Sequence, residues 1–192
     1  MNILLHICCA PCACYPVEKL SADGHKVTGF WFNPNIHPYR EYLARLEGLN
    51  LYVSKVALPI EIRDEYGLIP FLRATVEQES KPFRCIYCYN VRLRTTAEFA
   101  REHKFDAFTT TLLYSKYQLH DTIKEICESL SKEFGVAFYY EDFRVGWYRG
   151  IKISKELGLY RQKYCGCIFS EEEAIRTSAK NDLPGNRNEP VN

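Results

Sequence analysis

Short apolar runs alternate with segments of helical periodicity along most of this 192-residue chain. Runs rich in β-branched and aromatic residues predict strands at residues 2–8, 26–32, 59–63, 105–113 and 136–143. The intervening segments predict helices at residues 15–22, 37–56, 66–76, 85–104, 121–134 and 150–157. Strands that alternate with helices build a parallel sheet covered on both faces. We therefore expect a Rossmann-like, doubly wound α/β fold with a mostly parallel five-stranded sheet.

The length and the charge balance limit the kinds of protein this chain can be. A chain of this size buries a core without cross-links, so we expect one metal-binding catalytic domain over residues 1–179. Residues 180–192 are polar and lack periodicity, which predicts a disordered tail. The 25 basic and 24 acidic residues nearly balance, so any nucleic acid must be recognised by a local patch. No apolar run reaches the ~18 residues of a membrane span and no signal peptide is recognisable, so we expect a cytoplasmic protein without a membrane partner.

The chain carries nine cysteines, an odd number that argues against a disulfide framework. Cys127 lies on the apolar stripe of a predicted helix and is expected in the core, as is Cys14. The other seven form three clusters and are the candidate metal ligands, namely Cys8, Cys9, Cys12, Cys85, Cys88, Cys165 and Cys167. The first cluster follows the first strand, where open parallel sheets bind ligands and where a helix start favours thiolates.

Four thiolates suit either zinc or a [4Fe-4S] cluster. A structural zinc ion requires only four ligands and usually organises a small fold, whereas this chain has a periodic core and seven clustered thiols. The surplus favours an iron–sulfur cluster together with a second metal or a redox pair. Among the histidines, His37 is the functional candidate, because it follows the second strand and should lie beside the same crevice.

Five motifs occur in order over residues 1–174, namely HICCAPC, NPNIHPYREY, RCIYCYNVRL, TTTLLYSKYQ and YCGCIFSEEE. Together they resemble the cobalamin-independent epoxyqueuosine reductases of the QueH type. The resemblance implies reduction of the epoxide of epoxyqueuosine, at the wobble position of tRNA, to the alkene of queuosine. It also implies a fold similar to the adenine-nucleotide α-hydrolase (HUP) superfamily. The SGGxDS-like loop of its ATP-dependent tRNA thiolases is missing, so we expect neither ATP nor cobalamin.

The implied reaction consumes two electrons and two protons and releases water, which side chains alone cannot supply. We hypothesise that four thiols hold a [4Fe-4S] cluster as electron source and that others hold a second, mononuclear iron as Lewis acid. Cys8 and Cys9 are the candidate catalytic thiols. Asp64 and Asp142, at predicted strand ends, are the candidate catalytic carboxylates. An external donor such as a ferredoxin or a flavodoxin would supply the electrons.

The implied partner is tRNA, whose exposed bases stack on aromatic side chains and whose phosphates pair with basic ones. The predicted RNA-binding residues are Lys81, Arg84, Arg92, Arg94 and His37, accompanied by Tyr87 and Tyr89, and a second patch is Tyr114, Lys116 and Tyr117. Two alternatives stay open: a zinc-stabilised RNA-binding module without activity, and a thiol-dependent tRNA sulfurtransferase. The surplus of thiols counts against the first, and the missing phosphate loop counts against the second.

Overall fold

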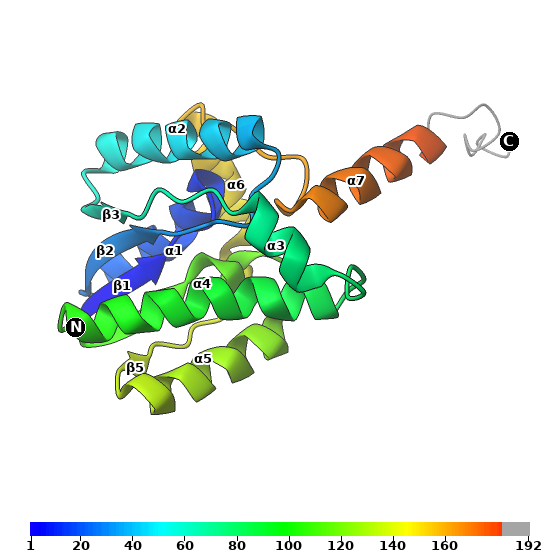
Figure 1. The fold of residues 1–192 in the computed structure, drawn as a ribbon. Helices are drawn as coiled ribbons and strands as arrows, with labels where there is room; N and C mark the ends of the chain where they lie inside the picture. Colours follow the sequence, from blue (N-terminus) through cyan, green and yellow to red (C-terminus); the bar gives the residue numbers. More distant parts are fainter. Residues whose placement is uncertain (182–192) are drawn as a thin grey trace, which may run out of the picture.

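The computed structural model describes residues 1–181 and contains one parallel five-stranded sheet (Figure 1). Its strands are β1 (Asn2–His6), β2 (Lys26–Trp31), β3 (Ile60–Ile62), β4 (Ala107–Thr110) and β5 (Ala137–Phe138). The order across the sheet is β3-β2-β1-β4-β5, and each neighbouring pair is parallel. The predicted parallel α/β fold is confirmed.

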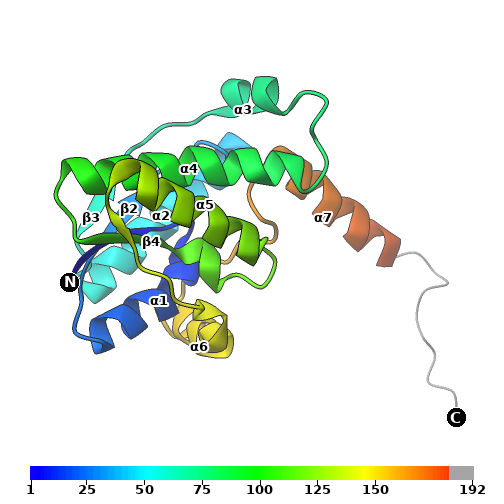
Figure 2. The ribbon, with the colours of Figure 1, turned by 90° about the horizontal axis from the view of Figure 1, so that it is seen from below.

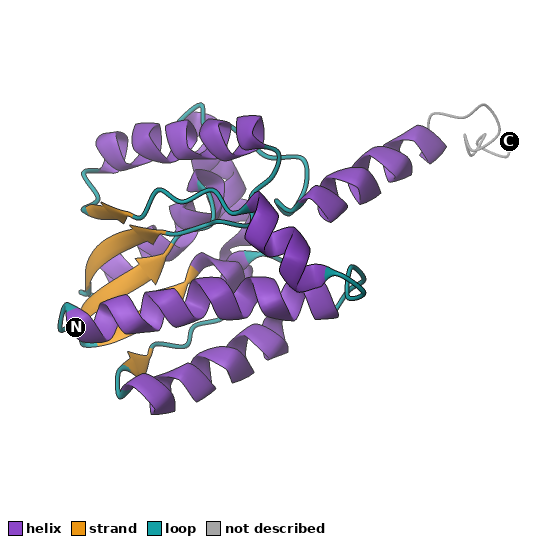
Figure 3. Ribbon diagram, in the orientation of Figure 1, coloured by secondary structure: helices purple, strands orange, loops and turns teal. Residues whose placement is uncertain are grey.

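Helices cover both faces of the sheet (Figure 3). They are α1 (Ala10–Ala22), α2 (Tyr39–Val56), α3 (Leu68–Thr75), α4 (Phe83–Glu102), α5 (His120–Phe134), α6 (Trp147–Glu156) and α7 (Ile168–Asn181), with short 3-10 turns η1 (Thr111–Tyr114) and η2 (Phe143–Gly146). Helices α1 and α6 pack together on one face, and α4 and α5 pack together on the other (Figure 2). Within residues 1–181, no helix combines the length and apolarity needed to cross a membrane.

The central strand β1 lies in the middle of the hydrophobic core. Its residues Ile3, Leu4 and Leu5 are all fully buried, because β2 and β4 flank the strand and helices cover both of its faces. A strand buried on both faces has a continuous apolar sequence rather than an alternating one. This explains why the chain begins with an apolar run.

The sheet reverses its strand order between β1 and β4. From β1 the chain continues to β2 and β3 on one side, and then crosses to β4 and β5 on the other. The last residues of the two central strands, His6 and Thr110, are therefore paired neighbours. Loops that leave such a reversal point form the crevice in which α/β proteins bind ligands. Here these loops contain Cys8 and Thr111.

Two predicted boundaries are wrong in ways that matter for the site. Helix α1 begins at Ala10 and not at residue 15, because Pro11 rather than Pro16 occupies the first turn. Strand β4 ends at Thr110, and residues 111–114 form η1 instead of extending the strand, since the Thr110 hydroxyl accepts a hydrogen bond from the Leu112 amide. The corrected boundaries place Cys12 on a helix.

The chain after the third cysteine cluster also differs from the prediction. It forms α7, a helix that the sequence analysis did not predict and that reaches outward from the rest of the molecule (Figure 1). The predicted domain limit at residue 179 falls inside this helix. Most of the predicted tail, residues 182–192, lies outside the described residues.

A core substitution tests the central position of β1. The Leu5→Ala variant is expected to lose about 2–5 kcal/mol of unfolding free energy, because a fully buried side chain leaves a cavity. The matched control is Leu51→Ala in α2, where Leu51 is 43% exposed and the expected change is within about 0.5 kcal/mol. Urea unfolding measures both values. Equal losses in the two variants would contradict the placement of β1.

Candidate metal and active site

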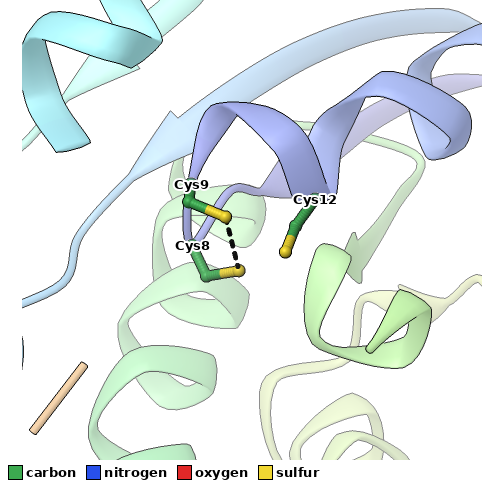
Figure 4. Close-up of side chains that lie close together, drawn as sticks. All are labelled: Cys8, Cys9 and Cys12. Atoms are coloured by element: carbon green, nitrogen blue, oxygen red, sulfur yellow. Dashed lines mark hydrogen bonds between the residues drawn. The ribbon is translucent and has the colours of Figure 1, made fainter. Parts of the chain in front are cut away.

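The first thiol set consists of Cys8, Cys9 and Cys12 at the junction of β1 and α1 (Figure 4). Their Sγ atoms all lie within 4.8 Å of one another, and those of Cys8 and Cys9 are 3.9 Å apart. Cys9 is the N-cap of α1, and Cys12 lies in its first turn. The positive end of the helix dipole therefore favours negative charge on these sulfurs. Three sulfurs this close can bind a single metal ion.

Two polar side chains from distant parts of the sequence hold these sulfurs. The Thr111 hydroxyl, at the end of β4, accepts from the Cys8 amide at 3.0 Å and donates to Cys8 Sγ at 3.3 Å. The Gln162 amide, between α6 and α7, donates to Cys9 Sγ at 2.9 Å. Sequence reasoning missed both residues. Thr111 was assigned to the interior of a strand, and no local pattern distinguishes Gln162 from an ordinary loop residue.

The three thiols differ in acidity. Hydrogen bonds from the Cys12 and Cys9 thiols lower the pKa of Cys8 well below its usual value, although burial acts against them. The bond that it shares with Cys8 raises the pKa of Cys12, and burial raises the pKa of Cys9. Of the three thiols, Cys8 is therefore the one that most readily loses its proton. Metal coordination deprotonates all of its thiol ligands.

The second thiol set combines Cys85 and Cys88 of α4 with Cys165 and Cys167 of the loop before α7. The two α4 thiols lie one turn apart, as predicted. The pKa of Cys88 is raised to about 12, mainly by burial; the Arg92 guanidinium acts to lower it, and the other three thiols of the set act to raise it. Cys88 and Cys167 pack in one small buried cluster, although their segments are far apart in the sequence. Four is the number of thiolates that a [4Fe-4S] cluster requires.

Arg45 fixes the loop that contributes Cys165 and Cys167. This buried guanidinium donates to the carbonyl oxygens of Tyr164 and Cys165 at 3.0 and 2.9 Å. It also pairs with Glu41 at 2.7 Å, so its charge is balanced. Between the two cysteines, Gly166 has φ 147°, a backbone conformation that favours glycine.

Arg92 is buried beside both thiol sets and is only 3% exposed. Its Nη2 donates to Cys88 Sγ at 2.9 Å, and its Nε donates to the Cys88 carbonyl at 3.1 Å. Burial acts to lower the pKa of Arg92, but the Cys88, Cys165 and Cys8 thiols outweigh it and raise the pKa.

The counter-charge of Arg92 comes from sulfur. None of the ion pairs among the described residues includes Arg92. Arginine stays protonated, and an uncompensated buried charge costs several kcal/mol. The residues around Arg92 therefore fit a thiolate-bound, anionic metal group.

A cavity of about 730 Å³ adjoins both thiol sets. Cys8 and Cys12 of the first set and Cys165 of the second line it, together with Arg92 and Gln118. The Gln118 amide donates to Cys165 Sγ at 3.1 Å. The cavity is in the size range of small-molecule sites, and its thiols and cation give it a polar wall.

Two of the five predicted RNA-binding residues, Lys81 and Arg92, line the cavity, and the other three do not. Lys81 is exposed and lines the cavity. Arg84 is 4% exposed and pairs with Glu173 of α7 at 2.5 Å. Arg92 is buried, as described above. Both arginines are almost fully buried, so the structure gives their predicted surface role no support.

The other two predicted RNA contacts lie away from the cavity lining. Arg94 is exposed but engaged by Glu133 of α5, with an Nη2 to Oε2 distance of 2.9 Å. His37 is fully buried against the rings of Tyr66 and Phe71, and burial lowers its pKa to about 4. Neither is placed to bind RNA beside the thiols.

The two predicted carboxylates are also engaged elsewhere. Asp64 is exposed after β3 and accepts a hydrogen bond from the Tyr42 hydroxyl at 2.6 Å. Asp142 accepts two bonds from the Arg144 guanidinium at 2.7 and 2.8 Å. Neither residue lines the cavity, so the geometry gives no support to a carboxylate ligand from this pair. Cys14 and Cys127 are buried in the main core, as predicted.

A thiol-lined cavity at the reversal point of a parallel sheet fits an α/β enzyme whose cysteines could hold a metal. The sequence matches the family described as "Epoxyqueuosine reductase QueH" over residues 3–173. The chain belongs to this family of epoxyqueuosine reductases and is an oxidoreductase.

Three relatives carry the description "Epoxyqueuosine reductase QueH". The relative from Dehalococcoides mccartyi is 35% identical over 172 residues, which cover 90% of this chain and 93% of the relative. The Thermotoga maritima relative is 34% identical, covering 88% and 90%. The Haemophilus influenzae relative is 33% identical, covering 88% and 71%.

A solved structure is similar to this chain in fold. It is the crystal structure of a predicted subunit of tRNA methyltransferase from Methanocaldococcus jannaschii. The TM-score is 0.56 at 11% identity, with 93% of this chain and 87% of that chain covered. The likeness supports the α/β fold that the sequence analysis expected.

Charge removal at Arg92 tests its pairing with sulfur. The Arg92→Gln variant is expected to bind less metal and to have a more negative reduction potential, because the thiolates lose their buried counter-charge. Removing one partner of a buried ion pair costs roughly 3–5 kcal/mol. Metal analysis and a redox titration under anaerobic conditions measure both effects. Arg92→Lys, which keeps the charge, is expected to retain more metal.

The matched control is Arg94→Gln, which removes an exposed arginine from the same helix. Its metal content and potential should equal those of the wild type. Wild-type metal content and potential in Arg92→Gln would show that Arg92 does not balance the charge of the thiols.

Proposed function

We propose that this chain reduces the epoxide of epoxyqueuosine in tRNA to the alkene of queuosine, in the cytoplasm. The observation that carries the proposal is that two thiol sets adjoin one cavity of about 730 Å³ in a member of the QueH family. The cavity gives a nucleoside access to both sets. The reaction requires electrons and activation of the epoxide oxygen, and two different metal groups side by side meet both requirements.

In this proposal the seven thiols form one set of four and one set of three. The four-thiol set of Cys85, Cys88, Cys165 and Cys167 has the ligand number of a [4Fe-4S] cluster. The three-thiol set, with all Sγ atoms within 4.8 Å, suits a single iron that keeps one coordination position for substrate. Bound there, the two groups would supply low-potential electrons and a Lewis acid for the epoxide oxygen.

The chain's own residues orient the sulfurs and balance their charge. Gln162 and Gln118 donate hydrogen bonds to Cys9 and Cys165, and such bonds to ligand atoms tune a metal site. Arg92 provides a fixed positive charge beside Cys88, which favours uptake of an electron there.

Electrons reach the site from outside the protein in this proposal. Cys165 is the one exposed residue of the four-thiol set, so a cluster held there would lie close to the surface. This position suits a small external donor protein such as a ferredoxin or a flavodoxin. The proposal requires neither cobalamin nor ATP.

Cysteine variants test the division of the thiols. Cys88→Ser is expected to lose about four irons per chain and the brown colour, because a [4Fe-4S] cluster lacks one ligand. Cys12→Ser is expected to lose about one iron and to keep the colour. Both variants should lose turnover. Iron analysis and visible absorption after anaerobic reconstitution make the measurement.

The control for these variants is Cys14→Ser, because Cys14 is buried in the core and its thiol donates to the Ala10 carbonyl. A serine hydroxyl can make the same bond, so iron content and turnover should match the wild type. Equal iron losses in Cys88→Ser and Cys12→Ser would contradict two separate metal groups.

The reaction itself is tested with the iron-loaded wild-type protein, a chemical reductant and tRNA that contains epoxyqueuosine. Nucleoside mass spectrometry should show conversion to queuosine, a loss of one oxygen atom. Unchanged epoxyqueuosine, with iron present and reduced, would refute the proposed reaction.

A further inference from the structure

An exposed group of aromatic residues lies at the edge of the thiol cavity. It consists of Lys116, Tyr117, Trp147 and Tyr148, which we call the aromatic rim. Tyr117 and Tyr148 are 78% and 79% exposed, the two highest values among the exposed large hydrophobic side chains of the described residues. Tyr117 and Trp147 line the cavity directly. The rim therefore adjoins the space beside Cys8, Cys12 and Cys165.

The rim has a rigid base. The Trp147 ring stacks on the buried Tyr114 ring at 5.2 Å, and the Tyr114 hydroxyl donates to the Trp147 carbonyl at 2.8 Å. The absence of a side chain at Gly150 permits this packing, since a Cβ there would lie 2.3 Å from the Tyr114 oxygen. Tyr114 thus fixes the Trp147 ring, whereas Tyr117 and Tyr148 remain exposed.

A cation accompanies the rings. Lys116 Nζ lies 5.5 Å from the centre of the Trp147 ring and 5.0 Å from that of Tyr148. Tyr117 meets Trp147 edge to face at 5.8 Å. Aromatic faces beside a cation bind unpaired bases by stacking and the adjoining phosphates by charge.

The rest of the cavity lining has the matching charge. Lys81, Arg161 and Lys163 also line the cavity, and all three are exposed. Glu173 is the one carboxylate in this lining, and it is already paired with Arg84. The lining is therefore locally basic although the whole chain has a net charge of only +1. A polyanion is the partner that fits such a surface.

We propose that the aromatic rim stacks the unpaired bases next to the modified nucleoside of the substrate RNA, with Lys116, Arg161 and Lys163 on their phosphates. The inference rests on the proposed function, because it starts from a wobble nucleoside inside the thiol cavity. The neighbouring nucleotides are covalently attached to that nucleoside and must lie at the mouth of the cavity. In an anticodon loop these bases are unpaired and free to stack.

The test compares RNA affinity in rim variants of the iron-loaded protein. Tyr117→Ala and Tyr148→Ala are each expected to bind an anticodon stem-loop about 5- to 150-fold more weakly, the cost of one lost base stack. Tyr148→Phe keeps the ring face and should bind like the wild type. Fluorescence anisotropy with a labelled stem-loop measures affinity. Iron content should stay at the wild-type value, because neither tyrosine is a candidate metal ligand.

A second lysine and tyrosine pair provides the matched control. Lys124 Nζ lies 4.6 Å from the ring of Tyr140, which is exposed but does not line the cavity. Tyr140→Ala removes the same kind of pair and should leave RNA affinity unchanged.

The possible outcomes distinguish failure of the rim proposal from failure of the proposed function. Wild-type affinity in both alanine variants, with normal conversion of epoxyqueuosine by the wild type, would overturn the rim and leave the function intact. Equal weakening by Tyr140→Ala would also overturn it, because the effect would not be specific to the rim. A wild-type protein that neither binds the stem-loop nor converts the nucleoside would overturn both.

Discussion

The candidate site of this protein lies at the adjacent carboxyl ends of β1 and β4. The two strands are neighbours although about one hundred residues separate them, because the strand order reverses between them. The bond from the Cys8 amide to the Thr111 hydroxyl joins the loops that leave these strands. Helix α4, which crosses to the other face and leads into β4, brings Cys88 and Arg92 beside the same point. The sheet topology therefore determines where the thiols converge.

Charge compensation is the second constraint. The two arginines buried near the thiols have different partners for their charge: Arg45 pairs with Glu41, whereas Arg92 donates a hydrogen bond to Cys88 Sγ. The cost of an unpaired buried cation makes thiolates at this site favourable, and a metal group keeps them deprotonated. In the proposed cluster site, the same positive charge would also favour reduction, because positive charge near a cluster stabilises the added electron.

Much of the fold could be predicted from the sequence, because the periodicity of each strand and helix is a local property. The alternation of elements predicted the parallel sheet, and the clustering of cysteines predicted candidate metal ligands, of which Cys8, Cys9 and Cys12 lie within 4.8 Å of one another. Which other residues lie beside these thiols was not predictable, because it depends on which loops meet in space. Gln162 illustrates this limit, since it lies more than 150 positions from Cys9, the sulfur to which it donates.

The predicted RNA surface differs from the structure for a reason that the sequence did contain. Arg84, Cys88 and Arg92 are spaced four residues apart on one helix and therefore share a face. Once Cys88 is assigned to a buried metal site, the two arginines must be buried with it. The exposed rim residues Tyr117 and Tyr148 come from two segments whose proximity only the fold shows.

The most direct measurement is Mössbauer spectroscopy of wild-type protein loaded with iron-57 and purified without oxygen. From the proposed function we expect two iron environments, about four irons in a cluster and about one mononuclear iron with sulfur ligands. A single cluster signal with no mononuclear iron would contradict the role of the three-thiol set. A colourless protein that retains stoichiometric zinc and takes up no iron would contradict the redox site altogether.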